Sequence, residues 1–512
     1  MTTALWIILI AILCYMAIML AIGFAVSGKS KTADGFFLGG RSLGPLVTAM
    51  SAEASDMSGW LLMGLPAVTL MGGITEASWT AVGLAIGTYL NWLFVAKRLR
   101  VYSGRLGAFT LPDFFSRRFA DSSHILTTVA ALFIVVFFIP YTASGFAACG
   151  KLFAALFDMD YLTAMLLCAA VILLYCTVGG FLAASTTDLF QSVIMTVALF
   201  VIVGFSEGLA HGFDTVFASV RSFDGYLDLF RGYDIAGGAT SSYGALPVAS
   251  TLAWGLGYFG MPHILLRFMG IKDENKLKIS RRVATVWVIL SMGVAILIGV
   301  VGTVLRQNGI LPLYETASAA ETVIVDLAKL LSTHGFVPAA VGGIVLAGIL
   351  ASTMSTADSQ LLAASSSVSQ NLLQEVLHLK LSPRASVWLS RLSVIVISIV
   401  AIFLARDPQS SVFRIVEFSW AGFGAVFGPV VLCSLFWKRT TKWGALAGMI
   451  IGGGTVFFWK FVIRRIFMGT VLDFYELLPA FLLALLSIVA VSLLTKAPDD
   501  SVTSVFEEVR AA

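Results

Sequence analysis

Acidic and hydroxyl-bearing residues interrupt two long apolar stretches of this sequence. The first interruption reads SAEASDMSGW from Ser51 to Trp60, and the second reads STMSTADS from Ser352 to Ser359. A carboxylate in the middle of a bilayer is costly unless a cation, a proton or water compensates it, so such residues indicate function by default. Sodium is a hard cation that prefers oxygen ligands, and carbonyls, hydroxyls and one nearby carboxylate suit it. The two stretches together therefore predict a site for a hard cation.

The hydroxyl groups of the second stretch fall at helical spacing. Ser352, Ser355, Thr356 and Ser359 recur every three or four residues and can share one helix face. Serine and threonine also bond back to carbonyls of their own helix, and this purely structural role stays open for them.

Four acidic residues fall inside or at the edge of apolar stretches, namely Glu53, Asp56, Asp188 and Asp358. We expect Asp56 to lie where its helix opens, next to freed backbone carbonyls. Asp188 begins an apolar stretch, so capping a helix is its second interpretation. Asp358 has a second interpretation as a salt-bridge partner. Glu53 either pairs with a base that the sequence does not identify or is protonated.

The elements that would position these residues are membrane-spanning helices. The chain has 512 residues, of which 58% are hydrophobic and 12% charged, with a mean hydropathy of +0.92. A soluble protein carries about a quarter charged residues, and the apolar blocks have the length of about 20 residues that crosses a bilayer as a helix. The first block lacks a basic leader, so we interpret it as a retained span. We predict an all-α integral membrane protein with about 13 spans, at roughly 4–27, 45–71, 75–97, 125–156, 161–184, 188–210, 244–268, 283–305, 336–374, 386–405, 412–436, 443–463 and 473–494.

Lysine and arginine predict the orientation. With the N-terminus outside, 23 of the 33 basic residues fall in inner loops and the tail, and 10 fall outside. The positive-inside rule then favours an external N-terminus and a cytoplasmic C-terminus. The basic cluster from Lys460 to Arg465 goes against this trend. The two longest loops, about 211–243 and 306–335, lie outside by this count.

Two of the predicted spans contain residues that break helices. The stretch WGLGYFGMP from Trp254 to Pro262 has three glycines and a proline. It begins the second half of the chain as the SAEASDMSGW stretch begins the first, five spans earlier. Spans 2–6 and 7–11 would then form two inverted repeats, at about 45–210 and 244–436, with a binding site where the broken helices meet. Close helix packing is the alternative explanation for such glycines and serines.

The remaining composition argues against other protein classes. The five cysteines lie in apolar blocks without metal-ligand spacing, and the five histidines are scattered. We therefore expect no enzyme, no cofactor beyond a transported ion and no nucleic-acid partner. We expect one transmembrane domain over 1–496 and a short cytoplasmic tail over 497–512. A passive channel or a sensor input domain remains a competing class, disfavoured by the paired broken helices and the lack of a signalling domain.

Five short motifs of the chain carry a family resemblance. They are LGGRSLGP at Leu38–Pro45, ASDMSGWLLMGLP at Ala54–Pro66, WGLGYFG at Trp254–Gly260 with Pro262 and His263, MST at Met354–Thr356, and WAGFGA at Trp420–Ala425 with FGP at Phe427–Pro429. With these motifs the chain resembles bacterial sodium/proline symporters in the sodium/solute symporter family. The match runs over nearly the whole chain, and its most specific part is the first broken span.

The resemblance implies the leucine-transporter-type fold with 13 helices and a secondary active transporter of the bacterial inner membrane that couples inward sodium movement to L-proline uptake. It implies sodium ligands at the backbone oxygens of Ala54, Met57 and Ser352 and the hydroxyls of Ser355 and Thr356, with Asp56 as the acidic residue needed for the ion. It implies proline near Ser58, Gly59, Tyr141, Trp254, Tyr258 and Pro262. Further functional candidates are Arg41, Ser55, Asp188 and Asp358.

Three positions depart from the family pattern. Ser352 stands where alanine is expected, which changes little if only its carbonyl oxygen binds the ion. Glu53 and Asp358 are additional acids that could alter ion preference or pH dependence. Another small solute, such as pantothenate, a sugar or a different amino acid, is the alternative substrate. In the proposed pocket, Trp254 and Tyr258 are four residues apart and would offer aromatic walls to a pyrrolidine ring and its ammonium group.

Overall fold

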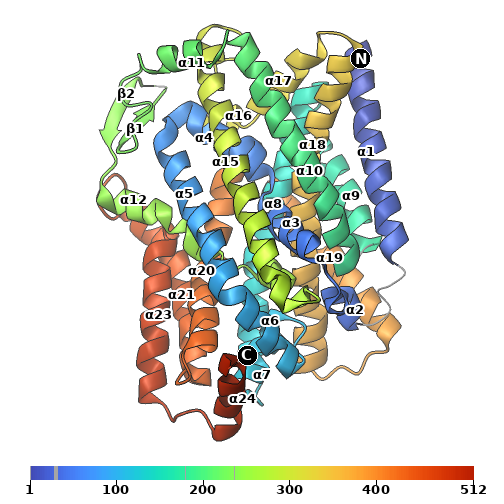
Figure 1. Cartoon of the computed structure of the whole chain (residues 1–512), viewed down its shortest axis with the longest axis vertical. Coiled ribbons are helices and arrows are strands. Elements are labelled where there is room, and N and C mark those ends of the chain that lie inside the picture. The colour runs from blue at the N-terminus through green and yellow to red at the C-terminus, as the bar shows by residue number, and fades with distance from the viewer. Residues whose placement is uncertain (1, 28–32, 179, 236, 512) are drawn as a thin grey trace.

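The structure is a computed structural model that describes residues 2–27, 33–178, 180–235 and 237–511. It is a helical bundle in which the N- and C-termini lie at opposite ends (Figure 1). The only sheet among the described residues is a two-stranded antiparallel hairpin at the end that carries the N-terminus.

The long crossings of the bundle are α1 (Thr3–Ser27), α5 (Ile74–Leu90) with η3 (Asn91–Val95) and α6 (Ala96–Leu106), α8 (Ile125–Phe157), α9 (Tyr161–Val178), α10 (Phe181–Leu209), α15 (Leu277–Gln307), α18 (Phe336–Ser366) with η5 (Ser367–Val376), α19 (Pro383–Ala405), α20 (Val412–Phe436), α21 (Lys442–Phe458) with η6 (Trp459–Ile463) and α22 (Arg464–Ile466), and α23 (Leu477–Leu494). Two crossings are broken: α3 (Pro45–Asp56) is followed by η2 (Trp60–Gly64) and α4 (Leu65–Gly72), and α12 (Ala245–Leu252) and α13 (Trp254–Gly257) are followed by α14 (Pro262–Gly270). The short connecting elements are α2 (Ala33–Leu38), η1 (Gly39–Arg41), α7 (Leu111–Arg118), α11 (Phe213–Val220), β1 (Arg231–Asp234), β2 (Ala239–Ser242), η4 (Glu274–Lys276), α16 (Ala317–Ala320), α17 (Val323–Ser332) and α24 (Asp500–Ala511).

The predicted spans coincide with helices. Ten helices of the described chain are long and apolar enough to cross a membrane, and three shorter apolar helices, Trp60–Gly72, Tyr161–Leu174 and Ala245–Gly257, lie in the other three predicted spans. Some boundaries differ: the helix of the predicted span 75–97 continues to Leu106, and α10 begins at Phe181 and not at the predicted residue 188. The glycine at position 180 has extended backbone geometry, and the helix starts directly after it.

The outer face of the bundle is apolar. Large hydrophobic side chains such as Leu174, Phe403 and Leu486 are 64–69% exposed. A water-soluble monomer rarely exposes so much apolar surface, whereas lipid tails cover it in a membrane. The composition and this surface agree that the chain is a multi-pass membrane protein.

The centre of the bundle is unusually polar. Helix α3 is buried from Thr48 to Asp56, and α18 is buried from Val345 to Ser366. The two helices pack against each other and against α10. The polar interruptions singled out in the sequence therefore lie in the middle of the fold, away from lipid.

The two ends of the bundle carry different elements. Helix α11, the hairpin and α17 lie at the end with the N-terminus, and they occupy the two long loops predicted to be external (Figure 1). Helices α6, α7 and α24 lie at the opposite end with the C-terminus. Within the tail, α24 buries Phe506 and forms ion pairs from Glu508 to Arg105 and from Glu507 to Lys438.

Candidate functional site

Helix α3 stops at Asp56, inside the bundle. Met57 leaves helical geometry with φ −76° and ψ 71°, and the chain resumes as the π-helical turn η2 at Trp60. Gly59 allows this break to approach α8, because a Cβ at that position would come within 2.8 Å of the Ala148 side chain. The predicted interruption of the first broken span is therefore present.

Four oxygens from α3 and α18 come together at this break. The Ser355 hydroxyl donates to the Ala54 carbonyl oxygen at 2.7 Å and lies 3.2 Å from the Ser352 carbonyl oxygen. The Thr356 hydroxyl donates to the same Ser352 carbonyl oxygen at 3.0 Å. All four residues are buried. Two carbonyls and two hydroxyls from separate helices form the kind of oxygen cluster that binds a hard cation.

The side chain of Asp56 points to a different neighbour. Its carboxylate accepts a 2.6 Å hydrogen bond from the Tyr258 hydroxyl, and its second oxygen has no hydrogen-bond partner among the described residues. Its backbone carbonyl accepts from the Trp60 indole at 3.0 Å and from the Tyr141 hydroxyl at 3.1 Å. Asp56 thus joins the end of α3 to α8 and to the residue that follows α13.

The second broken span supplies an aromatic group. Trp254 lies in a cluster with Trp60, Phe413, Trp420 and Tyr475, with ring centroids 5.3–6.2 Å from its own. The Trp420 indole also donates to the Trp254 carbonyl oxygen at 2.7 Å.

Tyr258 lies on the same side of the break. Its ring is edge-on to the Trp420 ring at a centroid distance of 5.1 Å, so Trp254 and Tyr258 both pack against Trp420. A Cβ at Gly257 would collide with the Trp420 indole, which explains the glycine there.

The other predicted solute residues also border the break. Ser58 and Gly59 form it, and the Ser58 amide donates to the Asp56 carbonyl at 2.8 Å. Pro262 begins α14 in the first turn, where its missing N–H costs nothing. Met57 ends α3, and its amide donates to the Glu53 carbonyl at 2.8 Å. All of these residues are buried.

A second polar group lies on the α3 side of the break and contains Asp188. The Arg267 guanidinium pairs with the Asp188 carboxylate at 3.2 Å, and the Ser51 hydroxyl donates to the same carboxylate at 2.7 Å. Arg267 also bonds to Ser359, whose hydroxyl donates to Asp358 at 3.1 Å. Helices α3, α10, α14 and α18 meet in this buried group. Because α10 begins at Phe181, Asp188 is an interior residue and does not cap the helix.

The remaining candidates do not touch the oxygen cluster. Arg41 donates to the carbonyl oxygens of Met269 and Ala108 at 2.7 and 2.6 Å and so ties the loop before α3 to α14 and α6. Ser55 bonds back to its own helix at the Ala52 carbonyl. Glu53 accepts a 3.0 Å bond from the Trp92 indole.

Arg267 and Tyr475 are not among the residues that the sequence singles out. The charge count assigns Arg267 to an inner loop, yet only 1% of it is exposed. The signal that could have indicated its position is the amphipathic helix α14, on which Arg267 lies four residues after His263. Tyr475 follows a loop after all of the predicted repeats, and no sequence signal pointed to it.

Comparison with known proteins gives one family match. A sequence model described as the sodium:solute symporter family matches residues 36–452. The chain is 42% identical over 495 residues to the high-affinity proline transporter PutP of Bacillus subtilis, covering 96% of this chain and 98% of that protein. It is also 42% identical over 507 residues to the sodium/proline symporter of Escherichia coli, covering 98% and 96% of the two chains.

Solved structures share the fold at low sequence identity. A substrate-bound, outward-open Na+-coupled sialic acid symporter superposes with a TM-score of 0.76 at 18% identity, covering 96% of this chain and 99% of that one. The nucleobase-cation-symport-1 family transporter Mhp1 superposes with a TM-score of 0.52 at 13% identity, covering 94% and 99%. The chain therefore has the fold of these symporters, as predicted.

Proposed function

The chain belongs to the sodium:solute symporter family, and we propose that it couples inward movement of sodium to uptake of L-proline. The observation that carries this proposal is a cluster of four oxygens near the break of α3. They come from Ala54, which is two residues before Asp56, and from Ser352, Ser355 and Thr356. The relatives named for proline favour that solute over pantothenate, a sugar or another amino acid.

In this mechanism sodium replaces hydrogen bonds between α3 and α18. The Ser355 hydroxyl donates to the Ala54 carbonyl oxygen at 2.7 Å in the structure. When sodium binds, the hydroxyl oxygens and the carbonyls turn toward the ion, which holds the two helices together by charge. Asp56 contributes its negative charge to the field at the ion without being one of the four oxygens. Met57 adds a fifth ligand through its carbonyl.

The proline site lies next to the ion site and shares residues with it. Tyr258 bonds to the Asp56 carboxylate at 2.6 Å, and Tyr141 bonds to the Asp56 carbonyl at 3.1 Å. Any movement of α3 on ion binding is therefore passed directly to two solute residues. Trp254 and Pro262 form the wall for the pyrrolidine ring of proline. The backbone groups of Ser58 and Gly59 bind the carboxylate and ammonium groups of proline. Ion and solute then bind with reciprocal coupling.

The coupling supplies enough energy for accumulation. One sodium ion moving inward through 100 mV yields about 2.3 kcal/mol, and a tenfold sodium gradient adds about 1.4 kcal/mol. The two together support accumulation of several hundred fold at one ion per solute. Transport proceeds by alternating access around the fixed site, and no chemical bond is made or broken.

We further propose the topology that the basic residues favour. The N-terminus is external and the C-terminus cytoplasmic in a bacterial inner membrane, because 23 of 33 basic residues then lie inside. The repeats span about 45–210 and 244–436, within one transmembrane domain over 1–496. The positions of the termini at opposite ends of the bundle support this topology (Figure 1).

The test is uptake of radiolabelled proline into proteoliposomes, with and without an inward sodium gradient. We expect uptake that requires the gradient and that unlabelled proline inhibits better than pantothenate, sugars or other amino acids. Trp254→Leu should raise the proline constant, meaning the proline concentration that gives half-maximal uptake, much more than the sodium constant, meaning the sodium concentration that gives half-maximal uptake. Uptake that does not depend on the sodium gradient would overturn the proposal, as would stronger inhibition by pantothenate, a sugar or another amino acid than by proline.

A further inference from the structure

Tyr475 belongs to the segment that joins α22 to α23, beyond residue 436 where the second predicted repeat ends. Its ring nonetheless reaches the aromatic cluster at the break. It stacks on Trp254 with a centroid distance of 5.3 Å and an interplanar angle of 26°. Tyr475 is buried, so this stacking forms part of the interior and not of the membrane surface.

Tyr475 holds the outer half of the second broken span at two points. Its amide donates to the Ser250 hydroxyl at 2.8 Å, and its ring stacks on Trp254, which lies four residues further along the same helical run. Residues four apart lie one above the other on a helix face. Tyr475 therefore contacts both ends of one helical turn, from Ser250 in α12 to Trp254 in α13, on the face that carries Trp254.

A third contact ties the same residue to α20. The Tyr475 hydroxyl donates to the Glu417 carbonyl oxygen at 2.8 Å. Tyr475 thus connects α12, α13 and α20, and fixes the distance between the Trp254 ring and the helix that bears Trp420.

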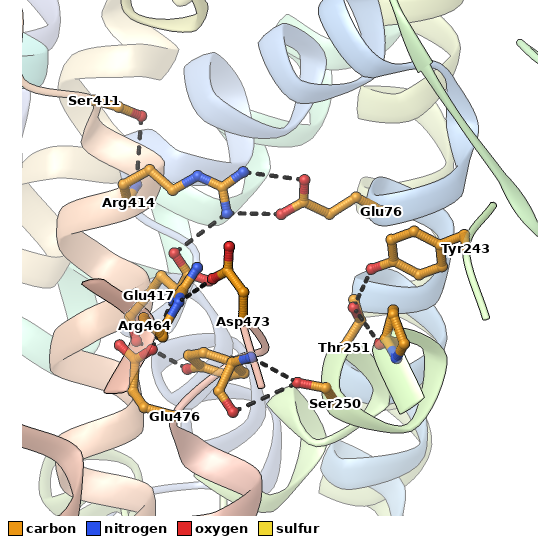
Figure 2. A network of polar contacts seen from close by, with 12 residues as sticks. Glu76, Tyr243, Ser250, Thr251, Ser411, Arg414, Glu417, Arg464, Asp473 and Glu476 are labelled. Atoms are coloured by element: carbon orange, nitrogen blue, oxygen red, sulfur yellow. Dashed lines mark hydrogen bonds and ion pairs between the residues drawn. The ribbon is translucent and has the colours of Figure 1, made fainter. Parts of the chain in front are cut away.

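The segment around Tyr475 is anchored by charge. Figure 2 shows Arg464 bonded to Asp473, two residues before Tyr475, and to Glu476, the residue after it; the distances are 3.1 and 2.8 Å. Lys460 adds a contact of 3.4 Å to Glu476.

The network continues to α5 through α20. In Figure 2, Arg414 bonds to Glu76 at 2.7 Å and to Glu417 at 3.3 Å. Glu417 and Glu476 are buried carboxylates that pair with basic side chains. Removing one partner of a buried ion pair is costly because the other charge stays buried. The segment therefore has one well-defined position, and Tyr475 has one well-defined position with it.

We propose that Tyr475 is a positioning residue for solute recognition, which fixes the Trp254 indole against which the proline ring binds. This inference rests on the proposed function, since it assigns Trp254 to the solute wall. It extends the recognition machinery to the segment between spans 12 and 13. A flat wall at a fixed distance discriminates rings by size, so Tyr475 should influence selectivity between proline and its four- and six-membered-ring analogues, azetidine-2-carboxylate and pipecolate.

The experiment compares Tyr475→Ala and Tyr475→Phe with Phe474→Ala in the full-length protein, reconstituted in proteoliposomes. Phe474 is the matched control, because its ring packs on Trp459 at 5.0 Å in the same segment and the structure gives it no ring contact with Trp254. Proline, azetidine-2-carboxylate and pipecolate constants are measured at saturating sodium, together with the sodium constant at fixed proline. Tyr475→Leu replaces the alanine variant if the latter does not reach the membrane.

We expect Tyr475→Ala to raise the proline constant by about 3- to 10-fold, the range for losing one aromatic pair. Its sodium constant should change by less than about 2-fold, and its preference for proline over the two analogues should narrow by a similar 3- to 10-fold. Tyr475→Phe keeps the stacked ring and loses only the hydroxyl bond to the Glu417 carbonyl oxygen, so its changes should be smaller than those of Tyr475→Ala, and Phe474→Ala should stay near wild type. Equal changes in Tyr475→Ala and Phe474→Ala, or an unchanged ring preference, would overturn the inference. Absence of sodium-driven proline uptake in the wild type would instead overturn the proposed function.

Discussion

Replacing Ser355 with alanine tests the oxygen cluster most directly. Its hydroxyl is fully buried and lies 2.7 Å from the Ala54 carbonyl oxygen and 3.2 Å from the Ser352 carbonyl oxygen. Alanine removes this oxygen and keeps the helix, since alanine is the best helix former. The backbone carbonyls of the site remain in place, so the change isolates one ligand.

The expected size follows from what the hydroxyl does with and without the ion. In the ion-free protein it makes neutral hydrogen bonds worth about 1 kcal/mol, whereas in the ion-bound protein it faces a charge, an interaction worth about 1.5–3 kcal/mol. The variant loses both, and the difference of about 0.5–2 kcal/mol weakens sodium by about 2- to 30-fold. Because sodium and proline binding are linked, the apparent proline affinity should fall at subsaturating sodium and recover at high sodium.

The assay is the initial rate of proline uptake over a wide range of sodium concentration, at matched amounts of protein in the membrane. Ser352→Ala is the control on the same turn of α18, because its hydroxyl bonds back to the Ile349 carbonyl at 2.8 Å and only its backbone oxygen faces the site. Ser352→Ala should keep a sodium constant close to wild type. If both variants shift equally, or Ser355→Ala does not shift at all, the oxygen cluster does not bind the ion.

Three further changes probe the neighbouring charges. Asp56→Asn keeps the shape and removes the charge, so sodium activation of uptake should weaken sharply, while Asp56→Glu should be milder; a wild-type sodium constant in Asp56→Asn would make this residue structural. Tyr258→Phe removes the 2.6 Å bond to the Asp56 carboxylate and should raise the sodium and proline constants together, by about 10-fold or more, since bonds to charged groups are worth about 1.5–3 kcal/mol; a change in the proline constant alone would contradict the shared site. Arg267→Ala leaves Asp188 as an unpaired buried charge and should cost about 3–5 kcal/mol of stability, which Arg267→Met combined with Asp188→Leu should largely restore; equal melting temperatures of the single and double variants in detergent would refute this.

The sequence predicted those features that depend on local composition. Runs of apolar residues long enough to cross a bilayer give the helices, and the glycines and prolines between Trp254 and Pro262 give the second break. The spacing of the α18 hydroxyls predicts a shared face, and in the structure Ser355 and Thr356 both bond to the Ser352 carbonyl oxygen, while Ser355 also reaches Ala54. Each of these follows from residues within a few turns of one another.

Features that depend on distant pairs were beyond the sequence. Arg267 and Asp188 are 79 residues apart, and nothing in either neighbourhood indicates that the other is its partner. An arginine at the end of an apolar run is typical of an interfacial residue, which is why it was counted with a loop. In the same way, the contact of Tyr475 with Trp254 joins a residue beyond the second predicted repeat to one inside it. Asp188 looked like a helix start because the small and polar residues before it resemble a loop, although α10 already begins at Phe181.

The buried pair of Arg267 and Asp188 has a consequence for how the protein opens. Arg267 lies on α14 and Asp188 on α10, so these two helices cannot move apart without separating two opposite charges. The attraction is strong while the pair is dry and falls about fourfold when water raises the effective dielectric constant from about 20 to about 80. The first waters to enter therefore make the next step of separation easier. We therefore expect the separation of α14 from α10 to be cooperative with the entry of water between them.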